Sequence, residues 1–360
     1  MCLVIRILTA SAAAAGLVAA LSTTAPVASL GGAAVAATTK ATHASGAHAK
    51  TAHSKAKAKA KAKTKARAKA RAKAREAAAK TPTTTLAKTT TSAATPTATA
   101  ATPTNCGGNP TLEASGRTWT CSFDDEFDGT TLDTSKWYVM TTAETGFTNA
   151  GECYMNSPDN VSVGNGYLSL TARTSGVVSL DGCSTTGGFV STIKSFSQAY
   201  GRFEIRAAFP NVKVAGVQSS LWMWPKSSPY GSWPTSGEID IAEYYSANPD
   251  RAIPYIHYSP SGTDPNVTNN YCLLADPSQF HTYLLEWTPQ TLTVKFDGVT
   301  CISDNWNPAA PLQKPAPFDV PFFLNLTQGL GVYQNQYNPL LTPLPATTKV
   351  DYVRAWSGSF

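Results

Sequence analysis

Three carboxylates crowd into six residues of the segment SWPTSGEIDIAEYY at 232–245. Glu238 and Asp240 alternate with isoleucines, which is the period-two pattern of a strand with one apolar face. Acids that share a face repel one another, so their pKa values separate and one carboxyl stays protonated while another is ionised. Such a pair can perform acid and nucleophile chemistry on one bond, as in glycosidic-bond hydrolysis.

Glu243 breaks the alternation because it follows Asp240 by three residues instead of two. In an unbroken strand it would face the core, where an unpaired carboxylate is very costly. A β-bulge around Ile241–Ala242 would return Glu243 to the face of the other two acids. Four strand steps would still separate the backbones of Glu238 and Glu243 by about 13 Å. Their side chains must therefore lean together to reach the carboxyl separation of about 5–5.5 Å used by retaining glycosidases.

The elements that must position these acids also have strand patterns. Period-two alternation with β-branched and aromatic residues recurs in six segments: 166–174, 201–209, 237–245, 281–288, 291–298 and 349–356. Asn165-Gly166 and Asp297-Gly298 mark tight turns. No stretch keeps an amphipathic helical period over three turns, so we predict an all-β sandwich or barrel. The chain has no glycine-rich phosphate loop and no HExxH, and its five histidines leave little room for histidine chemistry.

Charge divides the chain. Of its 29 lysines and arginines, 16 lie in residues 1–100, whereas only one of its 23 acids, Glu76, lies there. Within residues 37–80, lysine or arginine occupies every second position for much of the length. This spacing gives neither a helix nor a strand an apolar face that could be buried. We predict a disordered basic tail over 37–80, an extended Thr/Pro-rich linker over 81–104, and a folded domain over 105–360.

The first 36 residues predict a secretory signal peptide. Arg6 precedes the apolar run 7–21, which is short for a membrane span and is followed by small residues. We therefore expect a secreted, extracellular protein that is retained at the cell wall. The basic tail would bind anionic wall polymers or a membrane surface rather than nucleic acid, and a solvated spacer is the alternative.

Cysteine usage agrees with export. Removal of the signal peptide takes away Cys2 and leaves six cysteines, none with metal-ligand spacing, which favours disulfides in an oxidising compartment. Fifteen pairings are possible. Because short loops close at the lowest entropic cost, we predict sequential pairs, namely Cys106–Cys121, Cys153–Cys183 and Cys272–Cys301.

SGEIDIAE closely resembles the signature of glycoside hydrolase family 16 in its bulged Glu-x-Asp-x-x-Glu form. Further segments match in family order: FDDEFDGTTLDTSKW, NVSVGNGYLSLTAR, STIKSFSQAYGRFEIRAAFP, FHTYLLEWTPQTLTVKFDG, PFFLNLTQG and KVDYVRAW. The resemblance implies a jelly-roll sandwich of two antiparallel sheets with a sugar cleft on its concave face. It also implies a retaining mechanism, with Glu238 as nucleophile, Glu243 as general acid and then base, and Asp240 modulating the nucleophile and the shared proton.

Aromatic side chains just before the acidic strand are candidate sugar contacts, because sugar rings stack their CH faces on aromatic rings. Trp233 matches a family tryptophan that lines the cleft. Trp222 and Trp224 share one strand face and are either cleft platform or core.

Polar contacts and a metal site follow from the resemblance alone. Asn149 and Glu152 match a family segment near the donor subsites, His257 matches a histidine near the acid/base, and Gln328 is placed to reach the cleft. Many members hold a structural calcium on the convex side, for which Glu126 and Asp351 are the candidate ligands. Catalysis would need no cofactor, and we expect a monomer.

The expected substrate is a β-glucan polysaccharide. The bulged motif after Trp-Pro favours an endo-acting β-1,3-glucanase of the laminarinase type, and the acidic domain argues against sulfated galactans. Mixed-linkage β-1,3-1,4-glucan or another β-glycan is the alternative within the family. A wall-associated polysaccharide-binding protein without catalysis is the alternative outside it, and the presence of all three acids argues against that class.

Overall fold

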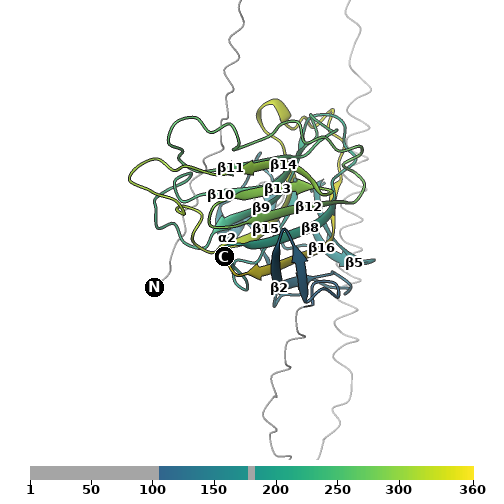
Figure 1. The fold of residues 1–360 in the computed structure, drawn as a ribbon. Coiled ribbons are helices and arrows are strands. Elements are labelled where there is room, and N and C mark those ends of the chain that lie inside the picture. The colour runs from purple at the N-terminus through teal and green to yellow at the C-terminus, as the bar shows by residue number, and fades with distance from the viewer. Residues whose placement is uncertain (1–104, 177–182) are drawn as a thin grey trace, which may run out of the picture. The chain divides into compact units, whose positions relative to one another are not determined.

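Strands dominate the part of the chain that the computed structural model describes, residues 105–176 and 183–360 (Figure 1). Two short helical elements accompany them there, α2 (Thr142–Thr145) and the 3-10 turn η1 (Tyr333–Asn335). The predicted signal peptide, basic tail and linker lie outside the described residues. All six segments predicted as strands are found as strands.

The acidic strand belongs to a sheet that we call the β10 sheet. Its hydrogen-bonded order is β11 (Ile253–His257), β10 (Glu238–Tyr245), β9 (Val217–Pro225), β15 (Phe322–Leu330) and β7 (Thr185–Ser191). Two short strands, β3 (Tyr138–Val139) and β4 (Cys153–Tyr154), also pair with β7. All neighbours are antiparallel except β4 and β7.

A second sheet, the β16 sheet, packs against the first. Its order is β6 (Tyr167–Thr174), β16 (Ala346–Gly358), β8 (Gly201–Ala208), β12 (His281–Trp287), β13 (Leu292–Phe296) and β14 (Val299–Asp304). Three more strands attach to it: β5 (Val161–Gly164) pairs with β6, β2 (Arg117–Asp125) with β16, and β1 (Thr111–Ala114) with β2. Because β6 also pairs with β7, hydrogen bonds run on from one sheet into the other.

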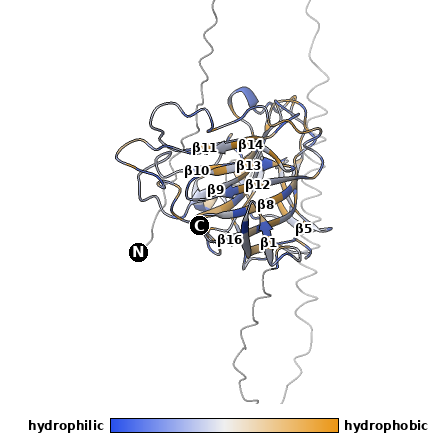
Figure 2. Cartoon of the chain, viewed as in Figure 1, coloured by the Kyte–Doolittle hydropathy of each residue, from blue (hydrophilic) through white to orange (hydrophobic). Residues whose placement is uncertain are grey.

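The core lies between the two sheets. Every second residue along β6, β8 and β13 is buried, and hydrophobic and hydrophilic residues accordingly alternate along the strands (Figure 2). Rings from the two sheets meet directly: Phe322 of β15 contacts Trp287 of β12, with ring centroids 5.3 Å apart. This is the predicted all-β sandwich.

The predicted turns and disulfides are present. Asn165-Gly166 and Asp297-Gly298 both have positive φ at the two residues, as a two-residue hairpin turn requires, and they join β5 to β6 and β13 to β14. The three sequential disulfides are all formed: Cys106–Cys121, Cys153–Cys183 and Cys272–Cys301.

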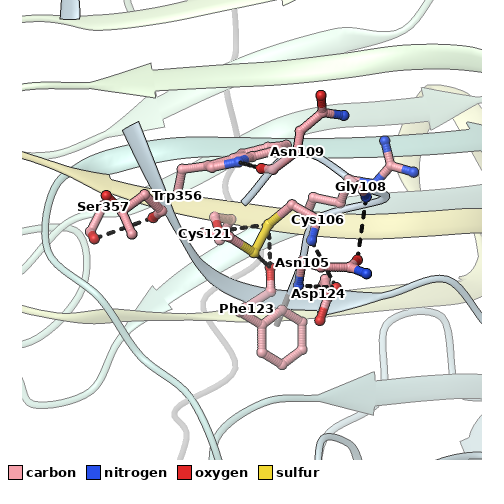
Figure 3. Close-up of a disulfide and its surroundings, with 12 residues drawn as sticks. Asn105, Cys106, Gly108, Asn109, Cys121, Phe123, Asp124, Trp356 and Ser357 are labelled. Atoms are coloured by element: carbon pink, nitrogen blue, oxygen red, sulfur yellow. Dashed lines mark hydrogen bonds between the residues drawn. A yellow bond between two sulfur atoms is a disulfide. The ribbon is translucent and has the colours of Figure 1, made fainter. Parts of the chain in front are cut away.

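The first of these disulfides fastens the start of the described chain to the sandwich (Figure 3). The backbone N–H groups of Asn105 and Cys106 donate to the Asp124 carboxylate, and the Trp356 indole donates to the Asn109 carbonyl. Residues 105–109 are thereby held against β2 and β16. Among the described residues, no helix has both the length and the apolar character that crossing a membrane requires.

Candidate active site

The acidic strand β10 contains the predicted bulge. Against β9, Asp240 lies opposite Trp222 and Ala242 lies opposite Leu221, so Ile241 is one residue without a partner. The register against β11 also shifts between Asp240 and Glu243. Ile241 and Ala242 are fully buried in the core, whereas Glu243 is half-buried on the face of the other two acids. The extra residue thus keeps a carboxylate out of the apolar layer.

Glu238 is the first residue of β10, and the residue before it, Gly237, has a backbone conformation that requires glycine. Gly237 has φ +85°, and a Cβ atom there would lie 2.8 Å from the Phe318 ring. The Glu238 carboxylate accepts a hydrogen bond of 2.6 Å from the Trp233 indole N–H. Burial raises its pKa well above the ordinary value and the Asp240 charge adds to this, whereas His257 and the Trp233 hydrogen bond lower it.

Asp240 is the most enclosed of the three acids, with 4% of its surface exposed. Its Oδ2 lies 3.1 Å from Nε2 of His257, a residue that is paired in register with Glu238 on the neighbouring strand. Burial and then the charge of Glu243 raise the pKa of Asp240 well above its ordinary value. The acidic group therefore holds a proton at a pH where separate carboxyls would be ionised.

Three hydrogen-bond donors surround the carboxylate of Glu243. Oε1 accepts from Nε2 of Gln218 and from Oγ of Ser220, each at 3.0 Å, and Oε2 accepts from the Tyr245 hydroxyl at 2.6 Å. Sequence reasoning missed all three donors. The signal was present, because Gln218 and Ser220 alternate in register with Trp222 on β9, and Tyr245 follows Glu243 by one strand repeat.

The predicted aromatic contacts lie on the outward face of the β10 sheet. Trp222 and Trp224 are half-buried and alternate with the fully buried Leu221 and Met223, so they face away from the main core. Their rings meet edge to face at 6.1 Å, and Trp222 donates to the Thr327 hydroxyl.

Trp233 and His257 form a second ring contact next to Glu238. Their centroids are 5.4 Å apart, and the Tyr255 ring stacks on the imidazole with a centroid distance of 5.6 Å. The structure places His257 beside Asp240 and Glu238, whereas the resemblance placed it near the acid/base.

Two predicted polar contacts are wrong. Gln328 is fully buried and accepts from the hydroxyls of Ser219 and Thr348, because on β15 it alternates with leucines and faces the interior. Glu152 is also fully buried, and it accepts from the Tyr154 hydroxyl and from the backbone N–H of Leu330. Neither side chain is exposed for direct contact with a sugar.

Asn149 lies near the site but binds protein groups. Its Nδ2 donates to the Leu330 carbonyl at 2.7 Å and to Oε1 of Gln218 at 2.8 Å. It is half-buried, and its contacts connect it to Glu243 through Gln218.

The calcium prediction does not fit the side chains. Arg354 donates two hydrogen bonds to Glu126, and Arg206 donates to Asp351. Each carboxylate already has a guanidinium as its counter-charge, and a calcium ion would have to displace it. Elsewhere in the described chain, Glu238, Asp240 and His257 offer ligand atoms within 4.8 Å of one another, and their mutual contacts and the Trp233 N–H already engage these atoms.

Comparison with known proteins places this site in a family. The family model for glycosyl hydrolases family 16 matches residues 149–315. The chain is 33% identical over 273 residues to glucan endo-1,3-beta-glucosidase A1 of Niallia circulans, a match that covers 69% of this chain and only 39% of that protein. It is 31% identical to the beta-glucanase of Rhodothermus marinus, over 66% of this chain and 85% of the relative. The solved laminarinase from Rhodothermus marinus superposes with a TM-score of 0.58 at 30% identity, over 67% of this chain and 98% of that one.

The sandwich presents the carboxylates of β10 and the tryptophans of β9 on one face of the β10 sheet, and its relatives are glycosyl hydrolases, so the chain is a glycoside hydrolase of the jelly-roll class. Within that class, the chain belongs to glycosyl hydrolase family 16. The family assignment made from the sequence motifs is thereby confirmed.

Proposed function

We propose that this protein is an endo-acting β-glucanase that cleaves β-1,3-glucan of the laminarin type with retention of configuration. The observation that carries the proposal is the bulged strand β10, which holds Glu238, Asp240 and Glu243 on one face beside Trp233. The named activities of the relatives from Niallia circulans and Rhodothermus marinus support a β-glucan as the substrate. Mixed-linkage β-1,3-1,4-glucan is the alternative substrate within the family.

In the proposed mechanism, an oxygen of Glu238 attacks the anomeric carbon and forms a glycosyl ester. Glu243 gives its proton to the leaving glycosidic oxygen as that bond breaks. Glu243 then takes a proton from water, and the water oxygen displaces Glu238 from the sugar. Two inversions at one carbon give net retention.

The proton balance among the acids supports these roles. Asp240 is more buried than Glu238 and lies beside Glu243, so it is the better place for a shared proton. Glu238 receives the Trp233 N–H at 2.6 Å, and a hydrogen bond to a carboxylate favours its charged, nucleophilic form. In the proposal, the negative charge of Asp240 raises the pKa of Glu238 in the free enzyme, and Asp240 takes up the shared proton when Glu238 ionises to attack the sugar.

Hydrolysis of laminarin tests the proposal. The purified protein should release reducing ends from laminarin, and Glu238→Gln and Glu243→Gln should each lower kcat by at least about a thousandfold, since a nucleophile and a general acid are lost. Glu113→Gln is the matched control, because Glu113 is exposed on β1 and should leave the rate unchanged. Intact laminarin, lichenan and agarose after incubation with the wild-type protein would show that it is not a β-glucanase.

We further propose that the protein is exported and that its basic segment 37–80 holds it on anionic wall polymer. The charge division of the chain supports this, with 16 of 29 basic residues in residues 1–100. Salt-dependent sedimentation of the protein with such a polymer tests this part of the proposal.

A further inference from the structure

Glu243 accepts a hydrogen bond from Gln218, and Gln218 in turn accepts one from Asn149. A chain of side-chain amides runs from the end of β15 to the acid: Asn149 donates to Gln218, and Gln218 donates to Glu243. The chain starts at a backbone carbonyl, that of Leu330, which accepts from Nδ2 of Asn149 at 2.7 Å.

The backbone carbonyl fixes the direction of every bond in this chain. A carbonyl only accepts, so Asn149 must turn its NH2 group toward Leu330. The second hydrogen of that NH2 group reaches Oε1 of Gln218 at 2.8 Å. Gln218 must then turn its own NH2 group toward Glu243, and it meets Oε1 at 3.0 Å. If the Gln218 amide were turned the other way, its carbonyl oxygen would face the Glu243 carboxylate, and neither oxygen could donate a hydrogen bond.

The segment that carries Asn149 is fixed in place by buried contacts. The fully buried Glu152 accepts from the Leu330 N–H at 3.2 Å and from the Ala150 N–H at 2.7 Å. The side chains of Asn149 and Glu152 thus bind both the carbonyl and the N–H of Leu330. The disulfide Cys153–Cys183 ties the next residue to the chain that leads into β7.

The direction of the Gln218 bond decides which oxygen of Glu243 can carry a proton. An amide N–H cannot become an acceptor, so Oε1 must remain an acceptor while Gln218 holds this orientation. A hydroxyl can turn, so Tyr245, at 2.6 Å from Oε2, can either donate to Glu243 or accept from it. Oε2 is therefore the oxygen on which a proton fits.

We propose that Asn149 is a positioning residue for proton transfer: acting through the Gln218 amide, it reserves Oε1 of Glu243 as an acceptor and leaves Oε2 to carry the proton for the leaving group. This inference rests on the proposed role of Glu243 as general acid. It gives Asn149 a function in acid catalysis in place of the predicted sugar contact.

Leaving groups of different basicity test the proposal. Laminarin releases a sugar alcohol and needs the acid, whereas 2,4-dinitrophenyl β-laminaribioside releases a stable phenolate and does not. We expect Asn149→Ala to lower kcat/KM on laminarin about ten- to a hundredfold, the scale of one hydrogen bond to a charged group. The same variant should lose less than about threefold on the dinitrophenyl substrate. A structural defect would lower both rates alike, and equal losses would overturn the proposal, as would no loss on either substrate.

A second variant and a control complete the experiment. Gln218→Leu leaves the Asn149 segment in place and should show the same split between substrates, and the double variant should be no worse than Gln218→Leu alone. Additive losses in the double variant would contradict a single chain of action. Asn156→Ala is the matched control, since Asn156 is exposed three residues beyond Cys153 and should behave as wild type. If the wild-type protein cleaves neither substrate, the proposed function fails instead.

Discussion

Glu238 lies between groups that act on its pKa in opposite directions. Burial and the charge of Asp240 raise it, while His257 and the Trp233 N–H lower it. A nucleophile must be ionised, so the pH at which activity begins depends on this balance. The neighbour that can be neutralised with the least change of shape is Asp240.

Asp240→Asn should therefore move the acid limb of the kcat/KM profile to lower pH. The amide cannot carry a negative charge, so it no longer raises the pKa of Glu238, and Glu238 ionises earlier as the pH rises. We expect kcat at the optimum to fall at the same time, about ten- to a hundredfold, because asparagine cannot take up the shared proton when Glu238 ionises to attack the sugar. The profile is measured on laminarin from pH 3 to 9. An acid limb that stays in place or moves to higher pH would show that Asp240 does not act on Glu238.

Single residues differed in how far the sequence could place them. The three acids share a face, as alternation and the three-residue step indicated. The error at Gln328 could have been avoided, because it alternates with Leu324 and Leu326 on the interior face of β15. The burial of Glu152 could not be predicted from a sequence pattern, because Glu152 lies in an irregular segment just before β4, a strand of only two residues.

At the scale of elements, the segment 258–280 between β11 and β12 is fastened to strand β14 at separate points. The disulfide Cys272–Cys301 joins them, and Asn269 donates to the Cys301 carbonyl at 2.8 Å. Asp264 of the segment meets Asp304 at the end of β14. Both oxygens of Asp304 are buried without a donor, and the Tyr258 hydroxyl and Lys314 are the other titratable groups that act on the pair in the described chain.

A shared proton is what makes this contact between acids favourable. Burial and the contact with Asp264 raise the pKa of Asp304 to about 7, and Lys314 opposes the shift. An unfolded aspartate titrates near 3.9. The folded state therefore binds more protons between about pH 4 and pH 7, so the free energy of unfolding falls as pH rises through that window and levels off above it.

Asp304→Asn should remove this loss of stability. The asparagine amide can donate to Asp264 as the carboxyl does and does not titrate, so the variant should match wild type near pH 4 and exceed it at pH 8 by about 2–4 kcal/mol. Urea unfolding at both pH values measures the difference, with the exposed Asp128→Asn as control. A variant that is less stable than wild type at pH 8 would contradict the shared proton. If calcium stabilised the wild-type protein but not Asp304→Asn, the two aspartates would instead bind a cation.

For the whole molecule, the sequence predicted the architecture better than the loops. Alternation marked the strands, and sequential pairing of six cysteines predicted all three disulfides, because the paired cysteines lie only 15, 30 and 29 residues apart in the chain. The amide chain to Glu243 could not be predicted, because it joins a loop, β9 and the end of β15, which are distant in sequence. The arginine partners of Glu126 and Asp351 could not be predicted for the same reason. Glu126 directly follows β2, whereas its partner Arg354 lies on β16. Asp351 lies on β16, whereas its partner Arg206 lies on β8.

The proposed role of the basic segment 37–80 belongs to the whole-molecule scale, because it concerns binding to the wall and not hydrolysis. Deleting residues 37–80 should leave kcat on soluble laminarin unchanged and abolish sedimentation with an anionic wall polymer such as teichoic acid. Wild-type binding should weaken steeply between about 50 and 200 mM salt, as expected when many cations contact a polyanion. Equal sedimentation of the two proteins at every salt concentration would exclude this role of the tail.

The configuration of the first product tests the central claim most directly. If Glu238 forms a glycosyl ester and Glu243 activates water on the opposite face of the sugar, which the leaving group has vacated, the reducing end released from laminarin is the β anomer. Proton NMR, recorded within the first minutes of hydrolysis and before mutarotation, distinguishes the two anomers. We predict that the β-anomer signal appears first and the α-anomer signal grows later by mutarotation. An α-anomer signal that appears first would contradict the double displacement and the roles given to both glutamates.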